Sequence, residues 1–288
     1  MKVGIGLPST VPGVDKDALV GWARLAEERG FSSLGTIDRL VFANYESLIA
    51  LAAAAAVTER IRLLTDILIV PYRVNAALLA KQAATIDSLS GGRLTLGVSV
   101  GGREDDYAVS EVPLSSRGKR MDAMLREMTE IWGGAERGYA GPIGPPPARP
   151  GGPELLVGGT ADAAFRRVGE FGNGWTNGGG GPDSFAAGAE KARTAWLEAG
   201  REGEPRLISL CYFALGKTAR EDADSYLHTY YGFLGDEIAG MIAGSAAVTP
   251  ETVVQYRDAF AQAGADELIY YPSTTDVGQV DLLADAVL

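Results

Sequence analysis

Short apolar runs alternate along the chain with longer stretches in which apolar residues recur every three or four positions. The first pattern is typical of buried strands and the second of amphipathic helices. Region 80–107 shows one unit clearly, because a helical pattern stops at the glycine pair 91–92 and a nearly all-apolar run, 94–100, follows it. The pattern repeats, and the strands that it predicts are 3–7, 31–38, 61–70, 94–100, 154–157, a strand at Trp175, 207–215 and 267–271.

Eight strands alternating with helices predict an α/β fold, a single (β/α)8 TIM barrel over residues 1–288 with all strands parallel. A doubly wound sheet is the alternative, but the first strand is not followed by the G-x-G-x-x-G of dinucleotide-binding sheets. Residues 133–153 are rich in Gly and Pro and are expected to form an insertion before strand five. Residues 222–247 are expected to form a helical insertion after strand seven, broken around 232–235.

Composition limits the kinds of molecule that the chain is expected to bind. The formal charge of −11 argues against nucleic acid or an anionic membrane, so a small-molecule ligand is expected. The single cysteine, Cys211, lies in an apolar run and is expected to be buried, which agrees with a reducing cytoplasm. The single histidine, His228, is expected to be structural or exposed, and the sequence predicts no metal site and no membrane anchor.

Candidate chemistry gathers at the predicted carboxyl ends of the strands, where parallel barrels bind ligands. Gly101 and Gly102 follow strand four, and Gly158 and Gly159 follow strand five. Without a Cβ, their backbone amides can approach an anion, and each pair precedes a helix whose positive end points the same way, so a phosphate is expected. A tight strand-to-helix turn with Thr160 as the helix N-cap is the alternative at strand five.

Several side chains lie beside these glycines. Arg103 could hold a phosphate with two hydrogen bonds, or it could pair with Glu104 or Asp105. Polar side chains at the exits could contact a ring or a substrate, although hydrogen bonding within the core is the alternative for each. Ser99 is one of these candidates, and Asp38 and Tyr107 are weak candidates for catalysis. Trp175 is expected to form a wall of the site.

The run 81–102, KQAATIDSLSGGRLTLGVSVGG, resembles the signature of the luciferase-like flavin-dependent oxidoreductases. That superfamily contains bacterial luciferase-type monooxygenases and reductases that use the deazaflavin F420. The resemblance continues more weakly at 155–160, 172–175 and 198–201. It implies a TIM barrel that holds the flavin phosphate at the exit of strand five. The cofactor-binding residues expected on this basis are Ser99, Gly101, Gly102, Arg103, Gly158, Gly159, Thr160 and Trp175.

The sequence departs from the pattern of this family at two positions. Family members often carry an arginine near the position of Val100, and an acidic-His pair at the end of strand two, where this chain has Asp38 and Arg39. A histidine base is therefore not expected, and a bound cofactor would supply the redox chemistry.

The favoured interpretation is a monooxygenase that uses reduced FMN and O2 on a small organic substrate and obtains reduced FMN from a separate flavin reductase. An F420H2-dependent reductase of a C=C, C=N or C=O bond is the first alternative. A non-catalytic flavin- or ligand-binding barrel is the second. The resemblance also implies a homodimer.

Overall fold

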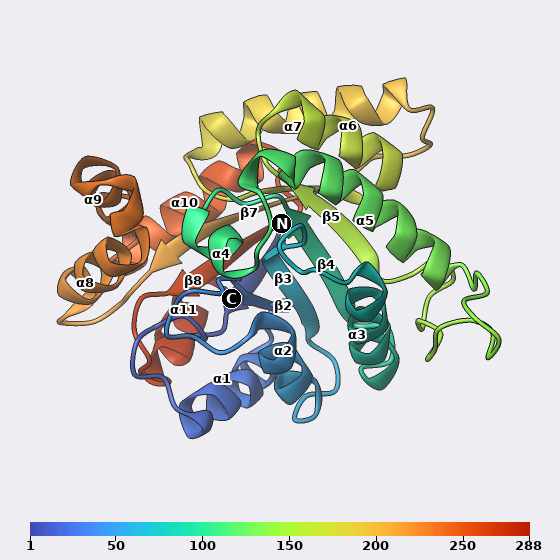
Figure 1. The fold of residues 1–288 in the computed structure, drawn as a ribbon. Coiled ribbons are helices and arrows are strands. Elements are labelled where there is room, and N and C mark those ends of the chain that lie inside the picture. The colour runs from blue at the N-terminus through green and yellow to red at the C-terminus, as the bar shows by residue number, and fades with distance from the viewer.

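The structure, a computed structural model, describes all 288 residues, and its eight parallel strands close into a barrel in chain order (Figure 1). The last strand pairs with the first, Val3 lying opposite Leu268. The predicted (β/α)8 barrel is therefore confirmed. The strands are β1 (Lys2–Gly6), β2 (Ser33–Thr36), β3 (Arg62–Ile69), β4 (Leu94–Ser99), β5 (Glu154–Gly158), β6 (Gly174–Asn177), β7 (Arg206–Phe213) and β8 (Glu267–Pro272).

Helices surround the barrel (Figure 1). The glycines after α3 have φ values of 68° and 84°, and the Gly92 N–H donates to the Asp87 carbonyl at 2.8 Å, which confirms the predicted stop. The helices are α1 (Lys16–Arg29), α2 (Ser47–Ala55), α3 (Ala76–Leu89), α4 (Glu104–Val109), α5 (Arg117–Trp132), α6 (Asp162–Phe171), α7 (Pro182–Glu198), α8 (Ala219–Tyr231), α9 (Asp236–Gly244), α10 (Pro250–Gln262) and α11 (Gly278–Val287), with short 3-10 turns η1 (Leu114–Ser116) and η2 (Gly232–Leu234).

Two apolar cores lie on the two sides of the strand wall. Along β7, Leu210 and Tyr212 belong to the core inside the barrel, whereas Cys211 and Phe213 belong to the larger core between strands and helices. This alternation follows from the two-residue period of a strand. The core inside the barrel includes Tyr226 and Tyr230 of α8, so this helix covers part of the carboxyl end of the barrel.

The connections differ in part from expectation. The charged stretch after β4 forms the short helix α4, which the sequence analysis did not predict. Residues 133–153 contain neither helix nor strand and protrude beyond α5 (Figure 1). The expected break after β7 is present, since η2 separates α8 from α9. His228 is exposed and Cys211 is buried, as predicted, and no helix is both long and apolar enough to span a membrane.

Candidate functional site

A cavity of 140 Å³, here called the mouth cavity, lies at the carboxyl end of the barrel. Its apolar wall comes from Ile37, Ile67 and Ile69, at the ends of β2 and β3. Gly101 and Gly102, after β4, form another part of the wall. The remaining lining residues are Asp38, Tyr72, Arg103, Asp106, Tyr107, Tyr230 and Tyr231. The structure therefore brings together the predicted residues of the strand-two and strand-four exits.

A bulge in β3 shapes the floor beneath this cavity. The register between β3 and β4 shifts between Thr65 and Leu68. The bulge needs Gly97 on the neighbouring strand, because a Cβ there would lie 2.1 Å from the Thr65 carbonyl oxygen. Ile67 then fills the space above β5, since a Cβ on Gly158 would lie 2.2 Å from its Cδ1 atom. Gly97 thus makes room for the Thr65 carbonyl of the bulge, and Gly158 makes room for the Ile67 side chain.

The exit of β5 presents backbone donors. The N–H groups of Gly159, Thr160 and Ala161 have no acceptor in the protein, and α6 begins directly after them. Gly159 has a φ of 119°, a conformation that favours glycine. The N-cap of α6 is Ala161, without a side-chain hydrogen bond, and Thr160 is exposed, so the predicted N-cap role of Thr160 is wrong. Free amides at a helix N-terminus suit an anion.

Trp175 lies behind this exit and not in the mouth. It is fully buried, and its ring lies 5.8 Å from that of Phe165 and 5.7 Å from that of Phe185. Its indole Nε1 donates to the Gly159 carbonyl oxygen at 2.9 Å. Trp175 therefore fixes the backbone whose N–H groups point outward.

Asp38 is buried in a hydrogen-bonded cluster. Its Oδ2 accepts from the Ile69 N–H at 2.9 Å and from the Tyr72 hydroxyl at 2.6 Å, and its Oδ1 accepts from Arg73 Nη2 at 3.0 Å. Arg73 also pairs with Glu46 at 2.8 Å. Both oxygens of Asp38 are occupied, so the residue ties the exit of β2 to the exit of β3.

Tyr107 and Ser99 flank the exit of β4. The Tyr107 hydroxyl donates to the Val100 carbonyl oxygen at 2.5 Å, and burial raises the pKa of Tyr107 to about 12. This phenol is therefore protonated at neutral pH. Ser99 is half-buried, and its carbonyl oxygen accepts from the Val70 N–H at 3.2 Å. Both residues support the polypeptide that forms the edge of the mouth.

Arg103 connects the exit of β4 to the end of α8. Its guanidinium lies 3.9 Å from the ring centre of Phe233, and Nη1 donates to the Tyr230 carbonyl oxygen at 3.1 Å. Asp105 pairs instead with Arg39 at 3.1 Å. The expected alternative in which Arg103 pairs with Glu104 or Asp105 is therefore wrong.

Tyrosines from α8 cover the mouth, a feature that sequence reasoning missed. The hydroxyls of Tyr231 and Tyr212 lie 2.7 Å apart, and that of Tyr226 lies 2.6 Å from Thr10 Oγ1. Burial raises the pKa of Tyr231, so its phenol also stays protonated at neutral pH. The spacing of Tyr226 and Tyr230, four residues apart, indicates from sequence only that both lie on one face of a helix.

Asp66 was also missed. It points into the barrel, where Thr176 Oγ1 donates to its Oδ1 at 2.7 Å while Oδ2 has no partner. Burial raises the pKa of Asp66 to about 7. The signal in the sequence was an acidic residue inside the apolar run 61–70.

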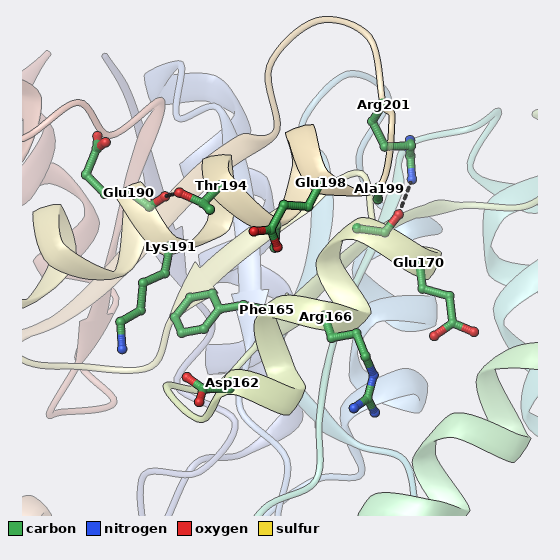
Figure 2. Close-up of a pocket in the computed structure, with 12 residues that line it drawn as sticks. Asp162, Phe165, Arg166, Glu170, Glu190, Lys191, Thr194, Glu198, Ala199 and Arg201 are labelled. Atoms are coloured by element: carbon green, nitrogen blue, oxygen red, sulfur yellow. Dashed lines mark hydrogen bonds between the residues drawn. The ribbon is translucent and has the colours of Figure 1, made fainter.

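A larger hollow lies elsewhere, on the outer surface between α6 and α7 (Figure 2). This groove has a volume of 870 Å³. Charged side chains of both signs, including Arg166, Glu190 and Lys191, line it (Figure 2). Small-molecule sites are mostly apolar and concave, so the smaller mouth cavity at the strand ends is the stronger candidate.

A family model described as luciferase-like monooxygenase matches residues 1–277. The chain belongs to this family. The family resemblance of run 81–102 is therefore confirmed. An uncharacterised protein of Mycobacterium tuberculosis is 33% identical to this luciferase-like chain over 198 residues, which cover 65% of the chain and 67% of the relative.

Relatives with named activities use two cofactors. The FMNH2-dependent dimethylsulfone monooxygenase of Pseudomonas putida is 26% identical to the luciferase-like chain over 270 residues, covering 83% of the chain and 73% of the relative. The F420-dependent glucose-6-phosphate dehydrogenase of Gordonia bronchialis is 28% identical over 150 residues, covering 49% and 44%. The family thus contains FMN- and F420-dependent oxidoreductases.

Solved structures share the fold. The monooxygenase RslO1 of Streptomyces bottropensis superposes with a TM-score of 0.76 at 22% identity, covering 99% of the luciferase-like chain and 98% of the other. An F420-dependent secondary alcohol dehydrogenase superposes with a TM-score of 0.80 at 17% identity, with the same coverage. At these identities the likeness shows the fold alone.

Proposed function

We propose that this chain is a flavin-dependent oxidoreductase, and that its reaction is the FMNH2- and O2-dependent oxygenation of a small organic substrate. The observation that carries the proposal is the free backbone N–H groups of Gly159, Thr160 and Ala161, one strand away from the glycine-lined mouth cavity. A separate reductase would supply the reduced FMN.

The β5 exit fits the phosphate of such a cofactor. Three consecutive amides without acceptors lie at the N-terminus of α6, which carries a partial positive charge. Trp175 holds the Gly159 carbonyl from behind, so the amides are oriented before a ligand arrives. The fit rests on backbone geometry and needs no basic side chain.

The flavin would supply the redox chemistry, and the protein would bind it, orient it and exclude water. The isoleucines of β2 and β3 give the mouth an apolar wall, and Tyr230 and Tyr231 cover it. Arg103 holds the end of α8 in place over this wall. Because Asp38 uses both carboxylate oxygens internally, it is not a free base for the reaction.

An F420H2-dependent reductase is the second candidate, favoured by the F420-dependent relative. The polyglutamate tail of F420 would need a basic rim. This chain has a net charge of −11, and Arg103, the basic residue nearest the mouth glycines, is stacked on Phe233. FMN, with a single phosphate, suits the chain better.

The test compares reduced FMN with reduced riboflavin, which lacks the phosphate. Hydrogen bonds to a charged group contribute about 1.5–3 kcal/mol each, so we expect FMN to bind at least about tenfold more tightly. Gly159→Ala forces a Cβ onto a backbone with a φ of 119°. It should weaken FMN binding about tenfold and leave riboflavin binding nearly unchanged.

Gly30→Ala is the matched control. Gly30 has a φ of 88°, its added Cβ would meet no atom, and it lies at the C-terminal end of α1, away from the strand exits. The control should carry the same kind of backbone strain without changing either affinity. Equal affinities of the wild-type protein for FMN and riboflavin would remove the β5 exit from the site.

A further inference from the structure

A second cavity lies where β6 stops short of its neighbour. The β6–β7 pairing ends at Asn177 opposite Ser209, whereas β7 continues to Phe213. The glycine loop Gly178–Gly181 crosses the gap. The resulting cavity, here called the β6–β7 notch, has a volume of 330 Å³. This volume lies at the lower end of the range of about 300–1,000 Å³ for small-molecule sites.

The walls of the notch are largely apolar. Leu210 and Cys211 of β7 line one side. Ile242 from α9, with Tyr256 and Phe260 from α10, lines the other. Such walls suit an aromatic ring or a short branched chain, because burying its apolar surface contributes about 25 cal/mol per Å².

The glycine loop gives the notch hydrogen-bond donors. The N–H groups of Gly178–Gly181 have no acceptor in the protein. The 17-residue helix α7 begins directly after them, and its N-cap residue Gly181 makes no side-chain cap bond. A Cβ on Gly178, Gly179 or Gly181 would meet no atom within 4 Å, so the loop is open to a ligand. These donors suit an anion.

Two buried polar side chains lie close in sequence to residues that line the notch, since Asn177 directly precedes Gly178 and Ser209 precedes Leu210. Asn177 Nδ2 and Ser209 Oγ have no hydrogen-bond partner, although the two residues are only 2% and 0% exposed. Cys211 lines the cavity, and Ser209 lies two residues before it on the same face of β7. Unpaired buried polar groups are costly, so a ligand that reaches them would gain affinity.

The notch is next to the mouth cavity. Tyr231 lines both, and its hydroxyl lies 2.7 Å from that of Tyr212, which also lines the notch. A ligand in the notch would therefore be separated from the expected flavin position by one tyrosine side chain.

We propose that the β6–β7 notch binds the organic substrate, and that this substrate is a small carboxylate with an apolar, ring-sized body. The carboxylate lies on the glycine loop, and the body packs against β7 and α10. The role as substrate rests on the proposed function, whereas the binding of such a carboxylate does not.

The test uses cofactor-free protein and benzoate as the probe. Cys211 is the only thiol and lines the notch, so its alkylation by iodoacetamide reports occupancy. Burial raises the pKa of this thiol, so the reaction is followed at pH 9 with enough reagent to give a measurable rate. We expect saturating benzoate to slow alkylation at least fivefold, and calorimetry to give an affinity for benzoate at least tenfold higher than for benzyl alcohol.

Substitutions at Gly181 separate charge from shape. Gly181 has the extended backbone of an N-cap residue, with φ −79° and ψ 176°, so Gly181→Asp should cap α7 and fold well. Its carboxylate would occupy the amide donors, and benzoate binding should fall at least tenfold. Gly181→Ala adds a Cβ in open space without a charge and should bind benzoate like the wild-type protein.

Two results would overturn the proposal. Equal affinities for benzoate and benzyl alcohol in the wild-type protein would show that the loop does not select anions. Unchanged benzoate binding in Gly181→Asp would show that the carboxylate binds elsewhere. Neither result bears on flavin binding, which the comparison of FMN with riboflavin tests separately.

Discussion

Asp66 is a carboxylate buried away from water inside the barrel. It is 1% exposed, one carboxylate oxygen has no partner, and its pKa is raised to about 7 because burial penalises the charged form. The charged and polar groups that act on it come from three elements and are Arg206 of β7, Glu267 and Tyr271 of β8, and Tyr231 of α8. Thr176 is its only hydrogen-bond donor.

This raised pKa predicts a loss of stability as pH rises. Between the ordinary value of 3.8 and about 7, the folded chain holds a proton that the unfolded chain has lost. The free energy of unfolding therefore falls across this window by about 1.4 kcal/mol per pH unit and changes no further above it. Asp66→Asn keeps the acceptor for Thr176 and removes the titration. From pH 5 to pH 8 the variant should gain about 2–3 kcal/mol relative to the wild-type protein, measured by urea unfolding. A difference independent of pH would contradict the assignment.

Close packing between β3 and β5 fixes the floor of the mouth. Ile67 occupies the space that a side chain on Gly158 would need, and the bulge that directs Ile67 inward depends on Gly97. β3 is therefore in close contact with β4 through the Thr65 carbonyl and with β5 through the Ile67 side chain. The exit of β5, which carries the candidate phosphate site, begins directly after Gly158.

Gly158→Ala tests the coupling. The added Cβ would lie 2.2 Å from Ile67 Cδ1, and the resulting overpacking should cost about 1–3 kcal/mol of unfolding free energy. In an Ile67→Ala background the same substitution should cost less than half as much, as a double-mutant cycle would measure. Gly102→Ala, whose Cβ meets no atom, is the control and should change stability by less than about 0.5 kcal/mol. Equal costs in both backgrounds would show that Ile67 is not the obstacle.

Local sequence patterns predicted the elements but not the contacts between them. The periodicity around Leu94–Ser99 and the glycine pair after α3 identified a strand and its preceding stop, because both depend on nearby residues. The bulge that brings Ile67 over Gly158 depends on the missing side chain at Gly97, on another strand. The position of Tyr231 over the mouth depends on how α8 packs, which no local signal encodes. Glycine exits were therefore predictable, whereas the lining between them was not.

The two ends of the barrel have different roles. At the amino end, Arg206 pairs with Glu154 at 2.5 Å and with the buried Glu267, and Arg62 pairs with Glu154 at 2.7 Å. These contacts close the barrel far from the strand exits. The carboxyl end holds the mouth cavity and the β6–β7 notch. Stability and binding are thus expected to separate along the barrel axis.

Arg206→Met tests this separation. Removing one partner of a buried ion pair leaves Glu267, which is 1% exposed, without its cation and should cost about 3–5 kcal/mol. Reduced FMN should bind the folded variant as it binds the wild-type protein. Arg126→Met breaks an exposed pair with Glu170 and should cost less than about 1 kcal/mol. A selective loss of FMN affinity in folded Arg206→Met would contradict the division of roles.

The central claim, a flavin-dependent oxygenation, is tested most directly by anaerobic titration of cofactor-free protein with reduced FMN and with reduced F420, followed by admission of O2. We expect reduced FMN to bind with a Kd in the micromolar range, about −8 kcal/mol, more tightly than F420, and the bound flavin to consume O2. Preferential binding of F420 without O2 consumption would contradict the monooxygenase and favour the reductase. Binding of neither cofactor would contradict flavin dependence and leave a barrel that binds other ligands.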